Sequence, residues 1–211
     1  MVKRSSILKG LTELENRGLN SGTSGNLSAR LGSNFLITPS GAIPAKLTVD
    51  ELVLVRLSRD GASNLDGLVP SSEWRMHHDI YTCRTEVRVV AHFHSPYATA
   101  LACNGRGIPS FHYMVAVAGG ENIRCAPYAT FGSQALSDST LMALEGRKAC
   151  LLANHGVVCV GTDISETVKL ATEIELLAKT YVLSLTIGSP NVLSGSEMKK
   201  VLTKFRTYGS K

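Results

Sequence analysis

Residues 87–94, VRVVAHFH, constrain the fold most, because this apolar run reads as a β-strand that ends with a histidine on each side of Phe93. Side chains two residues apart share one face of a strand. His92 and His94 are therefore expected on the same face as Arg88 and Val90, roughly 6–7 Å apart at the backbone. Two imidazoles at that spacing can bind one metal ion. The alternative is that both are polar residues on a solvated strand face.

Strand-like and helix-like segments alternate along the rest of the chain. Strands are predicted at 27–30, 34–38, 51–57, 123–128 and 149–161, and helices at 5–17, from 70, from 96, at 133–145, at 163–185 and at 196–209. No repeat, low-complexity segment or linker divides the 211 residues. The sequence therefore predicts a single α/β domain spanning 1–211. Periodicity alone leaves open whether its sheet is parallel or antiparallel.

Composition excludes several classes of protein. Hydrophobic residues make up 44% of the chain and charged residues 18%, which is typical of a globular protein. No apolar run reaches the roughly 18–20 residues needed to cross a bilayer, and the N-terminus lacks a signal-peptide pattern. The five cysteines form no CxxC pair, as expected of reduced thiols in a cytoplasmic protein. The net charge of +5 is scattered, which disfavours nucleic acid and suits a small anionic substrate.

Two further residues could join the histidine pair in a metal site. His155 lies in LLANHGVVCVG, an apolar strand interrupted by a turn-like Asn-His-Gly, so it is either a buried core residue or one aimed into a pocket. Glu73, in PSSEW, falls in the first turn of a helix, where a carboxylate either complements the helix dipole or serves catalysis. Three histidines and a carboxylate are a fitting set for catalytic zinc, with one position able to open for substrate.

Three loops could bind an anion. SGTSGN at 21–26, TPSG at 38–41 and the serines at 71–72 can each offer backbone N–H groups or hydroxyls to a phosphate. Each loop alone is more simply a turn. Together with a metal set, they favour a phosphorylated small-molecule substrate.

As a set, these segments resemble the class II aldolase and adducin family. The matching stretches are GLNSGTSGNLSAR, ITPSG, PSSEWRMHHDIY, VVAHFHSPYATALA, IPSFHYMVAVAGG, CAPYATFGSQAL, LLANHGVVCVG and KFRTYG. They cover nearly the whole chain in the family's order, and SSEWR, HYM, CAPYATFG and KFRTYG are most similar to its fuculose phosphate aldolases. The resemblance implies a three-layer α/β/α fold with a central, mainly antiparallel sheet. It also implies a homotetramer with active sites at subunit interfaces.

The resemblance implies a role for each matching residue. His92, His94 and His155 would bind one Zn²⁺ per subunit, with Mn²⁺ or Co²⁺ as alternatives. Glu73 would be a fourth ligand that moves off to act as the base, and Tyr113 from a neighbouring subunit would be the acid. The phosphate would be bound by Asn26, Ser40, Gly41, Ser71 and Ser72, and the aldehyde would be enclosed by Phe131, Phe205 and Tyr208. His77, His78 and His112 are expected outside the ligand set.

The activity implied is reversible cleavage of L-fuculose 1-phosphate to dihydroxyacetone phosphate and L-lactaldehyde through a metal-stabilised enediolate. Alternative substrates are 5-deoxyribulose 1-phosphate and 5-methylthioribulose 1-phosphate, and a dehydratase of methylthioribulose phosphate is a further branch. An L-ribulose-5-phosphate 4-epimerase is disfavoured, because its acidic residue is missing from FHYMVAVAGG before Glu121. A non-enzymatic, adducin-like interaction module should lack the metal ligands, and all four are present here.

Overall fold

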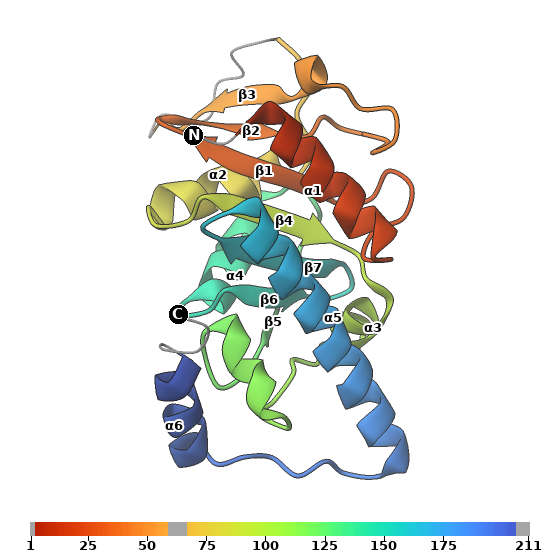
Figure 1. The fold of residues 1–211 in the computed structure, drawn as a ribbon, viewed down its shortest axis with the longest axis vertical. Coiled ribbons are helices and arrows are strands. Elements are labelled where there is room, and N and C mark those ends of the chain that lie inside the picture. The colour runs from red at the N-terminus through yellow and green to blue at the C-terminus, as the bar shows by residue number, and fades with distance from the viewer. Residues whose placement is uncertain (1–2, 59–66, 206–211) are drawn as a thin grey trace.

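A twisted sheet forms the centre of the computed structural model, which describes residues 3–58 and 67–205 (Figure 1). Seven strands are found in these residues: β1 (Asn26–Leu31), β2 (Asn34–Ile37), β3 (Val53–Arg56), β4 (Val89–Phe93), β5 (Arg124–Ala126), β6 (Ala149–Leu152) and β7 (Gly156–Gly161). Their order across the sheet is β3-β2-β1-β4-β7-β6-β5. Every neighbouring pair in it is antiparallel except β5 and β6. The predicted mainly antiparallel sheet is confirmed.

Helices cover both faces of this sheet. They are α1 (Arg4–Asn16), α2 (Trp74–Cys83), α3 (Pro96–Cys103), α4 (Gln134–Leu144), α5 (Ile164–Ile187) and α6 (Gly195–Phe205), with short 3₁₀ turns η1 (Val49–Glu51) and η2 (Tyr113–Ala118). One apolar core lies between the sheet and α1, α3 and α5, and a second lies between the sheet and α2 and α4 (Figure 1). The fold is therefore the predicted three-layer α/β/α arrangement.

Helix α5 shows how the sequence fixes these layers. The side chain of Asp163 accepts a hydrogen bond from the Glu166 backbone N–H and so caps the helix start. Apolar residues then recur every three or four positions, and Val168, Ala171 and Ile174 are fully buried. That stripe packs on the sheet, so the helix predicted at 163–185 forms and extends to Ile187.

Two predicted strands differ from those in the structure. The strand predicted at 87–94 covers Val89–Phe93 only, so His94 lies one residue beyond its end. The segment 149–161 forms two strands, β6 and β7, that pair antiparallel around a tight turn. Asn154 in this turn has a left-handed backbone, with φ of 55°, which lets the chain reverse direction.

Two helix boundaries also differ. The helix expected to open at Pro70 begins at Trp74, because the preceding residues form a turn in which the Trp74 N–H donates to Ser71 O. The helix expected at 196–209 runs from Gly195 to Phe205, and its last four predicted residues lie outside the described residues. Among the described helices, none combines the length and apolar character that crossing a membrane requires.

Strand β4 is the middle strand of the sheet, and all five of its residues are buried. It pairs with β1 on one side and β7 on the other. Any polar side chain on β4 therefore needs partners within the protein. His92 is such a residue, with 1% of its surface exposed.

A second fully buried histidine lies beneath the same sheet. His77 on α2 has its Nδ1 2.6 Å from the Ser28 hydroxyl, and that hydroxyl is 2.8 Å from the hydroxyl of Tyr81. Burial lowers the pKa of His77 to about 3. The ring is therefore neutral in the folded protein, whereas it takes up a proton below about pH 6.5 in the unfolded chain.

We predict that His77 makes the metal-free protein acid-sensitive. Keeping His77 neutral costs no free energy of unfolding above about pH 6.5. As pH falls from there toward the folded pKa, the unfolded chain binds a proton that the folded protein does not, and the free energy of unfolding drops by up to about 1.4 kcal/mol per pH unit. Urea unfolding at pH 7, 6 and 5 should show a shallower loss of stability in His77→Gln than in the wild type. The matched control is His112→Gln, because His112 is exposed. Equal slopes in His77→Gln and the wild type would contradict the prediction.

Candidate active site

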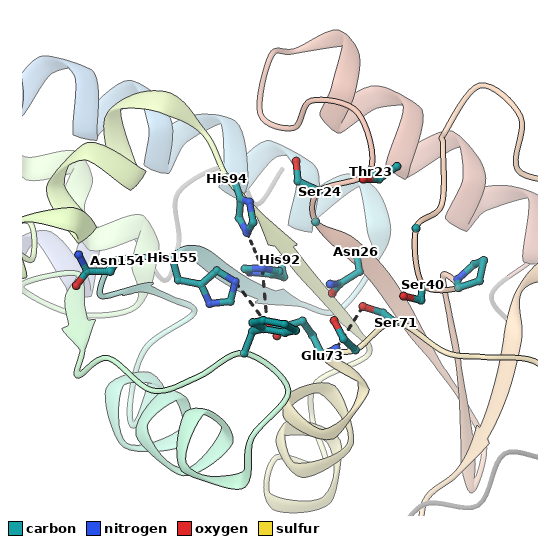
Figure 2. A pocket seen from close by; sticks show the side chains of 15 residues that line it. Thr23, Ser24, Asn26, Ser40, Ser71, Glu73, His92, His94, Asn154 and His155 are labelled. Carbon is teal, nitrogen blue, oxygen red and sulfur yellow. Dashed lines mark hydrogen bonds and ion pairs between the residues drawn. The ribbon is translucent and has the colours of Figure 1, made fainter.

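Three histidines converge where β4 ends and β7 begins. His92 comes from β4, His94 from the residue after it, and His155 from the turn between β6 and β7. One ring nitrogen from each lies within 4.8 Å of the others, and the Nε2 atoms of His92 and His94 are 3.0 Å apart. Figure 2 shows the three rings pointing toward one another. Three ring nitrogens gathered in this way could hold one shared metal ion.

A backbone carbonyl orients the central ring. The Nδ1 of His92 is 3.0 Å from the carbonyl oxygen of Val157 on the neighbouring strand. Because a carbonyl only accepts hydrogen bonds, Nδ1 carries the proton and Nε2 keeps its lone pair. The sheet itself therefore sets the tautomer that presents Nε2 to the cluster.

The surroundings keep all three rings neutral. Burial, with smaller contributions from His155 and His94, holds the pKa of His92 well below its usual value. Burial, and then the unfavourable approach of a second imidazole, His94, lower the pKa of His155 to about 4, and burial also lowers the pKa of His94. Neutral imidazoles are the form that binds a cation.

Glu73 lies beside the histidines, on the side of the sheet that α2 covers. It is the residue before α2 and is 4% exposed. Its Oε1 accepts the Gly132 N–H at 3.0 Å, while its Oε2 lies 3.8 Å from His92 Nε2 and 3.9 Å from His155 Nε2. Burial raises the pKa of Glu73, and the Gly132 bond opposes that shift.

The buried Oε2 of Glu73 has no hydrogen-bond partner among the described residues. A buried carboxylate oxygen without a partner is costly unless a positive charge lies beside it. Three neutral imidazoles and this oxygen, facing one point, fit a divalent metal ion.

The contact between Glu73 and Gly132 was not expected from the sequence. Gly132 has a φ of +72°, and a Cβ there would lie 2.9 Å from the carbonyl oxygen of Ser72. A side chain at position 132 would therefore push this loop away from Ser72 and lengthen the hydrogen bond from the Gly132 N–H to the Glu73 carboxylate. The signal available in the sequence was the glycine before the Ser133 helix cap, which by itself indicates only a turn.

The cluster forms one wall of a pocket of about 350 Å³ (Figure 2). The five predicted phosphate residues also line it: Asn26, Ser40, Gly41, Ser71 and Ser72. Phe131 lies at the rim and is 66% exposed. Lining residues not singled out individually by the sequence analysis are Thr23, Ser24, Gly25, Pro39 and Asn154. Asn26 on β1 pairs with His92 on β4, and this pairing explains why the predicted phosphate residues and the histidine cluster line the same pocket.

The remaining predicted residues do not meet this pocket within one chain. Tyr113 is 51% exposed, and its ring centre lies 6.4 Å from that of Phe205. Neither belongs to the described lining residues. Tyr208 lies outside the described residues.

The other histidines have different partners. His78 Nδ1 is 2.8 Å from an Asp79 carboxylate oxygen, and His112 Nδ1 accepts the Met114 N–H at 3.2 Å. With His77 bonded to Ser28, none of the three belongs to the metal-compatible group found in the described residues.

Comparisons with known proteins agree with this geometry. Residues 6–182 match the family described as Class II Aldolase and Adducin N-terminal domain. A 5-methylthioribulose-1-phosphate/5-deoxyribulose-1-phosphate aldolase of Rhodospirillum rubrum is 48% identical over 98% of this chain and 92% of its own. An L-fuculose phosphate aldolase of Escherichia coli is 44% identical over 93% of this chain and 91% of its own.

Similarity extends to solved structures. An L-fuculose 1-phosphate aldolase superposes with a TM-score of 0.89 and 36% sequence identity, covering 96% of this chain and 95% of that one. The family match, the identity to these relatives and the shared fold lead to one conclusion. The chain belongs to the class II aldolase and adducin family and is a class II aldolase, an enzyme that makes or breaks a carbon–carbon bond.

Proposed function

We propose that the protein reversibly cleaves a ketose 1-phosphate into dihydroxyacetone phosphate and an aldehyde. The observation that carries this proposal is the pocket itself. One wall presents His92, His94, His155 and Glu73, and the other presents hydroxyls, an amide and glycine-rich loops. A phosphorylated hydroxyketone has a group to match each wall.

His92, His94, His155 and Glu73 would hold one divalent ion per chain. Histidine with carboxylate suits Zn²⁺, and also Mn²⁺ or Co²⁺. When bound, the ion supplies Lewis-acid polarisation of the substrate's carbonyl and hydroxyl oxygens.

The phosphate would lie against Asn26, Ser40, Gly41, Ser71 and Ser72. No lysine or arginine is among the described lining residues, so hydroxyls, the amide and backbone N–H groups must supply the hydrogen bonds. Gly41 has a φ of +69° and open space at its Cβ, which leaves the backbone of the 38–41 turn accessible.

Glu73 would move the proton at carbon. In the cleavage direction, the hydroxyl on the aldehyde side loses its proton and the carbon–carbon bond breaks. The electron pair stays on the carbon that becomes the hydroxymethyl group of dihydroxyacetone phosphate, and Glu73 returns a proton there. Burial raises the pKa of Glu73, which favours a carboxyl group that takes up a proton and gives it back.

Tyr113 would exchange the proton at the aldehyde oxygen, acting from a second copy of the chain. Its exposure and its absence from the lining of the pocket support a role in trans. Phe131 would contact the apolar end of the aldehyde from the rim, joined by Phe205 and Tyr208. The homotetramer and the cytoplasmic location stay predictions.

Two substrate types fit this site. The 48% identical relative supports 5-deoxyribulose 1-phosphate and 5-methylthioribulose 1-phosphate, and the solved structure supports L-fuculose 1-phosphate. Each would release an aldehyde that carries a methyl or methylthio group, which suits the exposed ring of Phe131. The proposal therefore holds all three as candidates.

A substrate panel tests the proposal. Zinc-loaded protein should release dihydroxyacetone phosphate from at least one of these three ketose 1-phosphates, measured with a coupled reductase. The ranking of kcat/KM would identify the substrate. Epimerised L-ribulose 5-phosphate without cleavage of any ketose 1-phosphate would contradict the aldolase proposal while leaving the metal site in place.

His94→Ala should lose bound metal and cleavage together, because it removes one of three lone pairs at the cluster. Metal content after dialysis and the cleavage rate are the measurements. His112→Ala is the matched control, since His112 is exposed and bonds only locally. Full cleavage by metal-free His94→Ala would remove the cluster from the mechanism.

Glu73→Gln should keep most of the metal but lose proton exchange. The amide cannot take up the proton, and a positioned general base contributes about 10²–10⁴-fold. The measurement is exchange of the hydroxymethyl protons of dihydroxyacetone phosphate in D₂O, followed by NMR. Glu145→Gln, at an exposed position, should exchange normally. Normal exchange in Glu73→Gln would assign the base to another group.

A further inference from the structure

One buried side chain, Asn20, joins the two walls of the pocket. It lies between α1 and β1 and is 8% exposed. Its Oδ1 accepts the His94 backbone N–H at 3.1 Å. His92 is held by its pairing in the sheet, but His94 lies one residue beyond the last paired residue of β4. The hydrogen bond from its backbone N–H to Asn20 therefore holds His94 in place where the sheet does not.

The same amide packs on the loop at 23–26. A Cβ on Gly25 would lie 2.3 Å from Asn20 Nδ2 and 2.5 Å from Asn20 Oδ1. The Asn20 amide therefore occupies the space that a side chain on residue 25 would need. Gly25 and its neighbours Thr23, Ser24 and Asn26 line the pocket.

We infer that Asn20 is a positioning residue that holds the loop at 23–26 and His94 in one fixed arrangement. This inference rests on the proposed function, because it assigns a metal to His94 and a phosphate to the loop. Asn20 is not among the residues that line the pocket, so it would act on either ligand only through His94 or the loop. Through Asn20, the position of His94 depends on the position of the loop at 23–26, and the reverse.

The contact also explains why position 25 is a glycine. With a φ of +75°, Gly25 adopts a left-handed backbone that other residues reach only with strain. Gly22, just before this loop and outside the pocket lining, has a similar φ of +64°, but its Cβ would meet nothing within 4 Å. Both positions demand the same backbone conformation, and only position 25 excludes a side chain because of Asn20.

This pair of glycines gives a matched experiment. Gly25→Ala and Gly22→Ala carry the same backbone strain, but only Gly25→Ala pushes on Asn20 and through it on His94. Zinc affinity of the apo protein is measured by competition with a chromophoric chelator, without substrate. We expect Gly25→Ala to bind zinc at least about tenfold more weakly, the range found for groups that orient a metal ligand, and Gly22→Ala to match the wild type.

Asn20→Leu tests the same contact from the other side. It should weaken both zinc affinity and the binding of inorganic phosphate to the zinc-loaded protein, by at least about tenfold for zinc. Ser110→Ala is the control for a general loss of stability. Ser110 is also 8% exposed, and its hydroxyl donates a hydrogen bond to the backbone carbonyl of Leu193, which does not line the pocket. That control should lower the melting temperature without changing either affinity.

The outcomes separate this inference from the proposed function. If the wild type bound no zinc, the proposed function would fail. If the wild type bound zinc and His94→Ala did not, but Gly25→Ala and Asn20→Leu bound it normally, only the role of Asn20 would be overturned. Loss of phosphate binding alone, with normal zinc affinity, would also overturn the coupling.

Discussion

The antiparallel pairing of β4 with β1 and β7 is the interaction on which the site depends. It places Asn26 opposite His92 on one side and Val158 opposite it on the other, and it brings the Val157 carbonyl within 3.0 Å of His92 Nδ1. The central strand is buried on both faces, so its histidine is neutral and held in one tautomer. The sheet therefore leaves the Nε2 lone pair of His92 free to bind a cation, because its Nδ1–H is already bonded to the Val157 carbonyl.

Elements from distant parts of the chain complete the site around that strand. The β6–β7 turn brings His155, the start of α2 brings Glu73, and the loop before α4 holds Glu73 through Gly132. Each of these groups lies at the end of an element, where backbone N–H and carbonyl groups are free to bind ligands or side chains. The rigid sheet positions them, and the loops between elements supply the chemistry.

Much of this arrangement could be predicted from the sequence. A run of apolar residues located β4, and the Asn-His-Gly break located the turn that carries His155. The direction of strand pairing needed the family resemblance, because a period of two is the same in parallel and antiparallel sheets. Contacts such as Asn20 with His94 join residues 74 positions apart, and no local pattern records them. Likewise, His94 was expected within the strand, and its anchoring by Asn20 emerged only from the fold.

The most direct test of this account is X-ray absorption spectroscopy of the zinc-loaded protein. The account predicts a metal shell of three imidazole nitrogens at about 2.0–2.1 Å, completed by oxygen from a carboxylate or solvent. Replacing His155 with alanine should remove one imidazole from that shell. A shell built on cysteine sulfur, or one with a single imidazole, would contradict the claim that His92, His94 and His155 together hold the metal.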